Sequence, residues 1–206
     1  MALTVVAHSL GTKYAIDAAA VARLRDTLAS GGLVVYPTDT VYGLAADPFQ
    51  EAAVARAYLA KERPRDAPIS IAIASPAELF RFGTATPTAE AFCRKNLPGP
   101  FTVVLRATSD APRPVVSREG RIALRIPDHP IPRLLTKAFG PITATSANVH
   151  GRPSPATCTE AQDQLGDRVD VYVDGGPTPL RGESTVVDLS GPRPKILRQG
   201  VFPSGS

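Results

Sequence analysis

The sequence predicts an α/β protein whose sheet contains substantial parallel pairing. Short apolar runs alternate along the chain with segments of helical periodicity, and this alternation of strands and helices is typical of the class. Helix-capping signals stand at several of the boundaries. The 206 residues are 43% hydrophobic and 20% charged, which suits a globular chain with a sizeable core. These values argue against a disordered, coiled-coil or collagen-like chain.

Helices are expected where apolar residues recur every three or four positions. The expected helices cover residues 16–30, 50–61, 88–95 and 130–138, with two more beginning after Ser75 and Thr157. Gly31-Gly32 ends the first helix, and Pro64 ends the second because the residue before a proline avoids helical backbone. Glu78 and Glu160 stand three residues after the two capping hydroxyls and complete capping boxes.

Strands are expected where short apolar runs are bounded by turn residues. The expected strands cover residues 33–36, 69–74, 101–107, 121–126, 141–145, 169–173, 185–189 and 195–197. We expect one domain over residues 1–206, with residues 203–206 as a frayed tail.

The apolar runs and the cysteines of the sequence predict its cellular compartment. No apolar run approaches the roughly 20 residues that span a bilayer, and the first residues do not resemble a signal peptide. Cys93 and Cys158 form neither a CxxC motif nor a disulfide framework, which fits a reducing environment. We therefore expect a cytoplasmic protein without membrane association.

The charge is basic but modest, with a net charge of +4. Arginine supplies 18 of the 23 basic residues. A GC-rich genome would explain this excess, and so would recognition of phosphate or carboxylate groups, which guanidinium binds bidentately. Composition alone leaves both explanations open.

Polar clusters lie mainly where predicted strands end, and ligands of open α/β sheets bind at the carboxyl ends of strands. The clusters are Pro37–Gly43, Lys61–Arg63, Arg125, Thr145–Asn148, Gly182–Thr185 and Arg198. Taken singly, each fits a turn or a helix end. Together they supply a lysine, three arginines, hydroxyls and an amide, which suits an anionic ligand such as a nucleoside triphosphate. His8, His129 and His150 are scattered, so no protein metal site is predicted.

Seven segments, in this order along the chain, resemble the YrdC/TsaC family of threonylcarbamoyl-AMP synthases. They are GGLVVYPTDTVYGLAADP (31–48), Lys61-x-Arg63, LPGPFTVVL (97–105), ALRIPDHP (123–130), ATSANVHGRPSP (144–155), ESTVVDL (183–189) and ILRQG (196–200). The resemblance implies the short, single-domain form of that fold. This form is a twisted open mixed sheet with flanking helices around a large positively charged cavity.

The resemblance also implies an activity. L-threonine, bicarbonate and ATP would give L-threonylcarbamoyladenylate and diphosphate, a nucleotidyltransferase reaction assisted by Mg²⁺. The product would serve the biosynthesis of N6-threonylcarbamoyladenosine in tRNA, where a partner enzyme takes the adenylate. Weak binding of tRNA by this chain would fit the same pathway.

The family's site residues carry over onto matching positions of this sequence. Lys61 and Arg63 would be catalytic and would hold the phosphates. The other ATP-binding residues would be Ser146, Asn148, Ser154 and Arg198. L-threonine would be bound by Thr38, Thr40, Arg125 and Ser184. Mg²⁺ would bind through the triphosphate with few protein ligands. The chain departs from common family residues at Ala67, Ala72 and Arg121.

Two other functions fit parts of the pattern. A non-catalytic protein that binds tRNA or double-stranded RNA would use the same basic cavity to recognise A-form shape. The complete set of Lys61, Arg63, Ser146 and Asn148 favours the enzyme instead. A carbamoyl-adenylate former of the hydrogenase-maturation type would have this domain within a much longer chain.

Because Lys61 ends a predicted helix, we expect Lys61→Ala to abolish turnover and leave the fold intact.

Overall fold

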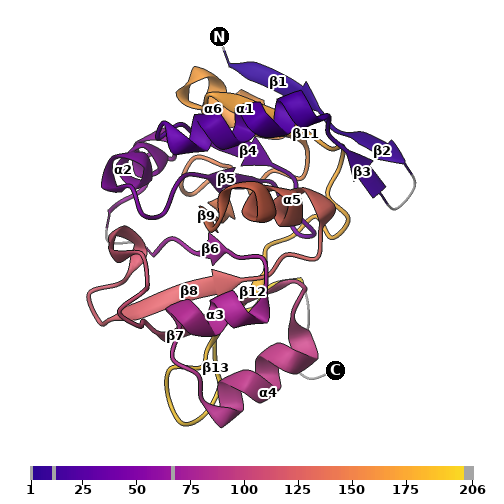
Figure 1. The fold of residues 1–206 in the computed structure, drawn as a ribbon. Coiled ribbons are helices and arrows are strands. Elements are labelled where there is room, and N and C mark those ends of the chain that lie inside the picture. The colour runs from indigo at the N-terminus through magenta and orange to yellow at the C-terminus, as the bar shows by residue number, and fades with distance from the viewer. Residues whose placement is uncertain (1, 11–12, 66–67, 202–206) are drawn as a thin grey trace.

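The computed structural model describes residues 2–10, 13–65 and 68–201, and in this part the chain forms two mixed sheets and a hairpin flanked by helices (Figure 1). The helices are α1 (Ala18–Ala29), α2 (Glu51–Ala60), α3 (Pro76–Phe82), α4 (Pro87–Asn96), α5 (Pro130–Phe139) and α6 (Cys158–Leu165), with short 3-10 turns at Arg113–Val115 and Gly166–Arg168. The strands are β1 (Leu3–Val6), β2 (His8–Leu10), β3 (Lys13–Ala15), β4 (Val34–Tyr36), β5 (Gly43–Ala45), β6 (Ile71–Ala72), β7 (Phe101–Arg106), β8 (Arg121–Arg125), β9 (Ile142–Thr143), β10 (Thr145–Ser146), β11 (Val171–Asp174), β12 (Thr185–Asp188) and β13 (Lys195–Arg198).

The five-stranded sheet has the order β1-β11-β4-β5-β10 and is covered on both faces. Val34 and Tyr36 face a core shared with α1 and α5. Leu33 and Val35 point the opposite way, into a core shared with α2 and α6. Side chains alternate between the faces of a strand, so a strand buried on both sides reads as a continuous apolar run. This explains the uninterrupted sequence LVVY.

The six-stranded sheet has the order β13-β12-β7-β8-β6-β9 and is covered by helices on one face. Val103 and Leu105 of β7 and Leu124 of β8 pack there in a core with residues of α3 and α4. The alternate positions of the same strands, such as Thr102 and Val104, face the other way and line a cavity. One face of this sheet therefore stabilises the fold while the other presents polar groups.

Residues 142–146 carry the chain from one sheet to the other. β9 pairs with β6 of the six-stranded sheet, whereas β10 pairs with β5 of the five-stranded sheet. Between them, Thr143 Oγ1 donates to Leu44 O (2.8 Å) and accepts from Ala46 N (2.8 Å), and it is fully buried. This crossing delivers Ser146 to the space between the sheets.

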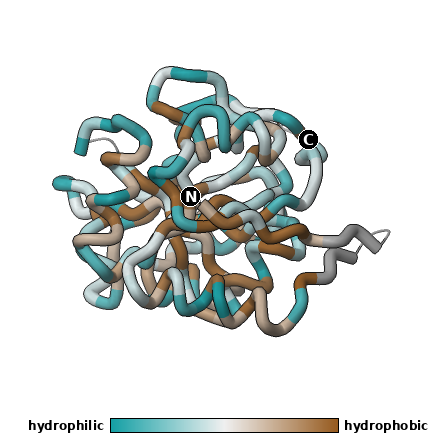
Figure 2. Tube along the Cα trace, turned by 90° about the horizontal axis from the view of Figure 1, so that it is seen from above, coloured by the Kyte–Doolittle hydropathy of each residue, from teal (hydrophilic) through white to brown (hydrophobic). Residues whose placement is uncertain are grey.

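Two of the predicted helix starts are confirmed at their caps. Ser75 accepts a hydrogen bond from the Glu78 N–H, and Thr157 accepts one from the Glu160 N–H. Figure 2 shows the hydrophobic segments gathered towards the interior and hydrophilic ones mainly on outer loops. No helix in the described part of the chain is both long and apolar enough to cross a bilayer.

The predicted α/β class, with mixed pairing and flanking helices, is confirmed. The strands are divided between two sheets, a division that strand periodicity does not reveal. Apolar periodicity did not predict β1, the β2-β3 hairpin or β5, which begins at a glycine within a polar cluster. The tail at residues 203–206 lies outside the described residues, and the single domain over residues 1–206 stays a prediction.

Candidate functional site

A cavity of about 500 Å³ lies between the six-stranded sheet and the β10 edge of the five-stranded sheet. Its floor consists of alternate residues of neighbouring strands, among them Thr102 and Val104 of β7, Ala123 of β8 and Val186 of β12. The charged residues in its lining are Lys61, Arg63, Arg125, Arg152, Arg198 and Glu183. Among the described residues of the lining, five cations against one carboxylate give the cavity a positive field suited to an anionic ligand.

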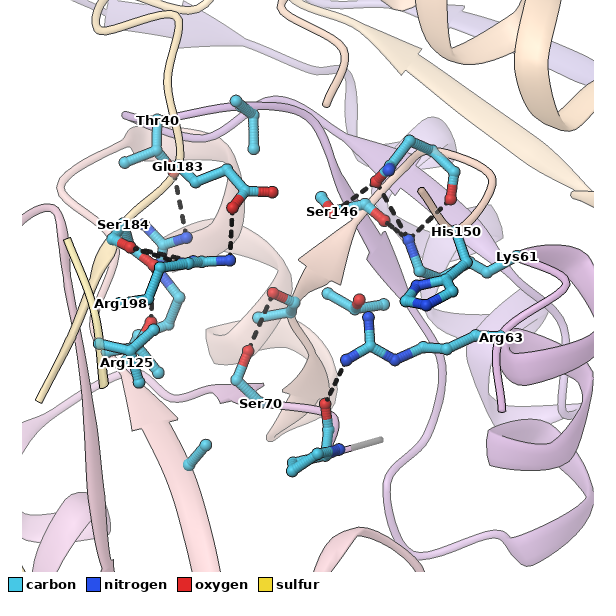
Figure 3. A pocket seen from close by; sticks show the side chains of 18 of the residues that line it. Thr40, Lys61, Arg63, Ser70, Arg125, Ser146, His150, Glu183, Ser184 and Arg198 are labelled. Carbon is cyan, nitrogen blue, oxygen red and sulfur yellow. Dashed lines mark hydrogen bonds and ion pairs between the residues drawn. The ribbon is translucent and has the colours of Figure 1, made fainter. Parts of the chain in front are cut away.

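Two groups of polar side chains face each other across this space. Lys61, Arg63, Ser146 and His150 lie on one side, as Figure 3 shows. The opposite side carries Thr40, Arg125, Glu183, Ser184 and Arg198. The first group comes from the end of α2 and from the loop after β10, and the second comes mainly from β8, β12 and β13 and their loops. We call them the lysine wall and the arginine wall.

Lys61 holds the loop of the lysine wall in place. Its ammonium donates to the carbonyl oxygens of Ser146 and Asn148, the latter at 2.7 Å, and to Asn148 Oδ1 at 3.2 Å. The Lys61 carbonyl accepts from the His150 N–H at 2.7 Å. Burial lowers the pKa of Lys61 from 10.5 to about 7, the nearby Arg63 lowers it too, and Glu183 opposes both.

The expectation that Lys61→Ala leaves the fold intact requires correction. Lys61 does end α2, but only 1% of its surface is exposed and it ranks among the large, fully buried side chains. Truncation would leave buried carbonyl oxygens without donors and would open a cavity. Its position at a helix end therefore does not make it structurally dispensable.

The loop at residues 146–152 is also held by its own hydrogen bonds. Ser146 Oγ donates to Asn148 Oδ1 at 2.5 Å. The Asn148 amide donates to Val149 O at 3.0 Å and to Arg152 O at 2.7 Å. The Ser-x-Asn spacing thus lets the two side chains form a hydrogen bond while the Asn148 amide closes the turn. The side chain of His150 lines the cavity beside this loop.

Arg63 extends into the cavity with part of its hydrogen-bonding capacity unused. Its Nη2 donates to Pro68 O at 3.0 Å, whereas Nε is buried without a hydrogen-bond partner among the described residues. Burial lowers the pKa of Arg63, and Arg198 across the cavity lowers it further, while Tyr58 and Glu183 act in the opposite direction. A phosphate group in the cavity would relieve the repulsion between the two arginines.

Arg125 of the arginine wall forms a buried ion pair. Its Nη2 contacts Asp39 Oδ1 at 2.7 Å and its Nη1 donates to Thr40 Oγ1 at 3.1 Å. Both charged side chains are about 5% exposed, and Arg125 Nε and Asp39 Oδ2 have no hydrogen-bond partner in the described part of the chain. Arg125 therefore meets a ligand with part of its charge already balanced by Asp39.

Thr38 lies one hydrogen bond away from the cavity. Its hydroxyl donates to Val41 O at 2.7 Å, lies 2.9 Å from the Thr40 hydroxyl and accepts from the Thr40 N–H at 3.1 Å. Thr40 itself lines the cavity. The geometry gives Thr38 the role of fixing the turn that presents Thr40.

Arg198 spans the end of the arginine wall. Its Nη1 lies 2.5 Å from Glu183 Oε2, and its Nη2 donates to the Ser184 carbonyl at 2.9 Å. Ser184 Oγ lies 2.9 Å from Thr102 Oγ1. The other oxygen of Glu183 accepts from Ser154 Oγ at 2.5 Å, so Ser154, like Thr38, reaches the cavity through a neighbour.

The structure brings together most of the residues predicted for the site. Those that line the cavity are Thr40, Lys61, Arg63, Arg125, Ser146, Asn148, Ser184 and Arg198. Sequence reasoning assigned no role to Asp39 or Glu183, although both stand within the quoted motifs. Each is adjacent to an assigned residue, but no spacing shows that its partner is a distant arginine. Arg121, noted as a departure, pairs with Asp188 outside the cavity lining at 3.1 Å, and Ala67 lies outside the described residues.

His129 has a structural role as a helix cap. It is 5% exposed, caps α5 by accepting from the Ile131 N–H at Nδ1 (3.2 Å), and does not belong to the described cavity lining. Burial lowers its pKa to about 4, while Asp39 and Asp128 act in the opposite direction. Among the described residues, no group of three or more His, Cys, Asp or Glu side chains could hold a metal ion.

Comparison with known families decides the membership of the chain. The model of the Sua5/YciO/YrdC family, described as "Telomere recombination", matches residues 26–200. The chain belongs to the Sua5/YciO/YrdC family. Family members similar to it include a threonylcarbamoyl-AMP synthase of Vibrio cholerae, 36% identical over 179 residues that cover 85% of this chain and 94% of that protein. A threonylcarbamoyl-AMP synthase of Pyrococcus abyssi is 39% identical over 84% of this chain.

Solved structures of the Sua5/YciO/YrdC family share the fold. The structure of Pyrococcus abyssi Sua5 complexed with L-threonine matches 97% of this chain with a TM-score of 0.87 and 34% identity. This chain spans 57% of that structure and 52% of the curated Pyrococcus abyssi relative. Escherichia coli YciO matches over 98% of this chain and 97% of its own, with a TM-score of 0.86. Its identity of 24% supports the fold alone.

Proposed function

We propose that this protein is a threonylcarbamoyl-AMP synthase, a nucleotidyltransferase that forms threonylcarbamoyl-AMP and diphosphate from L-threonine, bicarbonate and ATP. The observation that carries the proposal is the cavity in which the lysine wall faces the arginine wall. This cavity lies in a protein that is 36% identical to the Vibrio cholerae threonylcarbamoyl-AMP synthase over most of both chains. The product would serve N6-threonylcarbamoyladenosine biosynthesis in tRNA.

The reaction calls for positioned charge. An oxygen of the threonine carbamate attacks the α-phosphorus of ATP, the bond to the β-phosphate oxygen breaks, and diphosphate leaves with the bonding electrons. Negative charge moves onto the leaving phosphates, so catalysis depends on cations aimed at them. Arg63 and Arg198, on opposite sides of the cavity, are placed for this role. No covalent enzyme intermediate is required.

Lys61 acts chiefly through the loop that it holds. Its ammonium already has three oxygen acceptors in the loop, so it fixes Ser146 and Asn148 and adds positive charge at close range. Ser146 and Asn148 then have fixed positions from which to hold the nucleotide. Ser154 supports the far side of the same site through Glu183.

The arginine wall suits L-threonine. Arg125 lines the cavity, and its guanidinium is the kind of group that binds a carboxylate. Thr40 and Ser184 offer hydroxyl groups to the amino acid, and Thr38 fixes the position of Thr40. Because the negative charge of Asp39 offsets part of the positive charge of Arg125, the site can bind a single carboxylate without a large excess of positive charge.

Mg²⁺ would enter with the triphosphate, where it would neutralise phosphate charge. The hydroxyl, carbonyl and carboxylate oxygens of the lining are the kind of hard ligands that Mg²⁺ accepts, and it usually keeps several waters and phosphate oxygens. Glu183 is the acidic residue among the described residues of that lining. We further propose that a separate partner enzyme takes the adenylate, that tRNA binds weakly, and that the protein works in the cytoplasm.

The test is the release of diphosphate from ATP and Mg²⁺, with and without L-threonine and bicarbonate. Release should require both co-substrates, and Arg63→Gln should reduce it strongly, whereas Arg94→Gln on the exposed side of α4 should not. Release that ignores threonine would refute the proposal. Binding of tRNA without diphosphate release under any of these conditions would favour the RNA-binding alternative.

A further inference from the structure

Glu183 occupies an unexpected place for an acidic side chain. It is the one carboxylate among the described residues that line the cavity, whose other charged members are cations. Both of its oxygens are engaged, Oε1 with Ser154 Oγ and Oε2 with Arg198 Nη1, each at 2.5 Å. Figure 3 shows Glu183 reaching towards the guanidinium of Arg198 on the arginine wall.

The contacts of Glu183 connect two parts of the site. Arg198 ends β13 at the edge of the six-stranded sheet, and Ser154 follows the loop that Lys61 holds. The side chains of Glu183 and Arg198 are 37% and 46% exposed, so solvent and ligands can reach the pair. An ion pair of this exposure is weak enough for a competing anion to displace.

The field of Glu183 also reaches the lysine wall. Its carboxylate acts to raise the pKa values of Lys61 and Arg63, against the lowering caused by burial. Glu183 therefore favours the charged forms of Lys61 and Arg63, and it is the ion-pair partner of Arg198, when no phosphate is present. Triphosphate oxygens placed among these cations would lie close to the same carboxylate and would be repelled by it.

We propose that Glu183 is an internal counter-anion that makes the binding of a nucleoside triphosphate depend on a divalent cation. This inference rests on the proposed function and adds a specificity-determining residue to the same site. Without the cation, the triphosphate and Glu183 compete for Arg198 and repel each other. With the cation, the carboxylate faces a positive charge, and Arg198 is free to turn to the phosphates. Glu183 thereby selects the metal complex of ATP over free ATP.

Glu183→Gln tests this role because glutamine keeps the length and an acceptor for Ser154 while it removes the charge. Glu90→Gln is the matched control, since Glu90 is exposed on α4 and the change in net charge is the same. The measurement is the dissociation constant of ATP by titration calorimetry, once in EDTA and once in excess Mg²⁺. The decisive quantity is the ratio of the two constants.

In the wild type and in Glu90→Gln, Mg²⁺ should tighten ATP binding by at least about fivefold, the lower end of typical coupling between two ligands. In Glu183→Gln, ATP in EDTA should bind more tightly than to the wild type, and the gain from Mg²⁺ should largely disappear. An unchanged ratio in Glu183→Gln would overturn the inference and leave the proposed function standing. Failure of the wild type to bind ATP under either condition would overturn both.

A second variant separates this role from a structural one. Arg198→Gln leaves Glu183 without its cation, so ATP in EDTA should bind much more weakly and the ratio should increase. Loss of a merely structural contact would weaken binding equally with and without Mg²⁺. Equal weakening in both variants would therefore also overturn the inference, even if one of them unfolds more readily in urea.

Discussion

Replacing the buried ammonium of Lys61 should change how the stability of the protein depends on pH. Lys61→Met keeps the length of the side chain and removes the titrating group. The folded protein holds the pKa of Lys61 at about 7, chiefly through burial, against 10.5 as the ordinary value. Between these pH values the unfolded chain binds a proton that the folded chain has released, so the free energy of unfolding rises with pH in this window.

The magnitude follows from the linkage relation. Each pH unit within the window contributes about 1.4 kcal/mol to the free energy of unfolding. Because the folded protein is already half deprotonated at pH 7, the wild type should gain about 2 kcal/mol of stability relative to Lys61→Met from pH 7 to pH 9. Below pH 7 both states of the wild type bind the proton, and the difference between the two proteins should become constant.

The assay is urea unfolding at pH 6, 7, 8 and 9, followed by circular dichroism. Lys137→Met is the control for the loss of a lysine, because Lys137 is exposed on α5. Other titrating groups are common to all three proteins and cancel in the differences. If the free energies of unfolding of the wild type and Lys61→Met differ by a constant amount from pH 6 to pH 9, the lowered pKa of Lys61 is refuted.

Two further substitutions test the packing around the site. Asp39→Asn leaves Arg125 as a buried charge without its counter-ion. The free energy of unfolding, measured in urea, should therefore fall by about 3–5 kcal/mol. An unchanged free energy of unfolding would contradict the role of the pair. In Gly43→Ala, the added Cβ would lie 2.9 Å from the ring of Tyr36, which should cost about 1–3 kcal/mol and lower the Tm. An unchanged Tm would show that the ring can shift.

Local signals predicted much of the fold. The helix expected over residues 130–138 is α5 at Pro130–Phe139, and the strand expected over 101–107 is β7 at Phe101–Arg106. Capping residues and apolar periodicity act over a few positions, so they can be read from the chain directly. β5 was missed because its pairing between β4 and β10, rather than its own short sequence GLA, makes it a strand.

The sequence predicted which residues line the site better than it predicted the hydrogen bonds and ion pairs between them. Thr40 and Arg125 were expected near each other, but the buried pair of Arg125 with Asp39 depends on a contact between residues 86 positions apart. Likewise, the burial of Lys61 follows from the loop at residues 146–148, which no local pattern around the lysine reveals. Such contacts belong to tertiary structure and become visible only when the sheets are placed.

The separation of these contacts along the chain has a consequence for biosynthesis. The acceptors of Lys61 follow it by 85 and 87 residues, and Arg198 contacts Glu183 from the last described strand. A nascent chain can therefore form α2 and β4 early but cannot complete the cavity until residue 198 has left the ribosome. Products that stop before β13 would contain most of the core but lack Arg198, one of the cations placed on the phosphates.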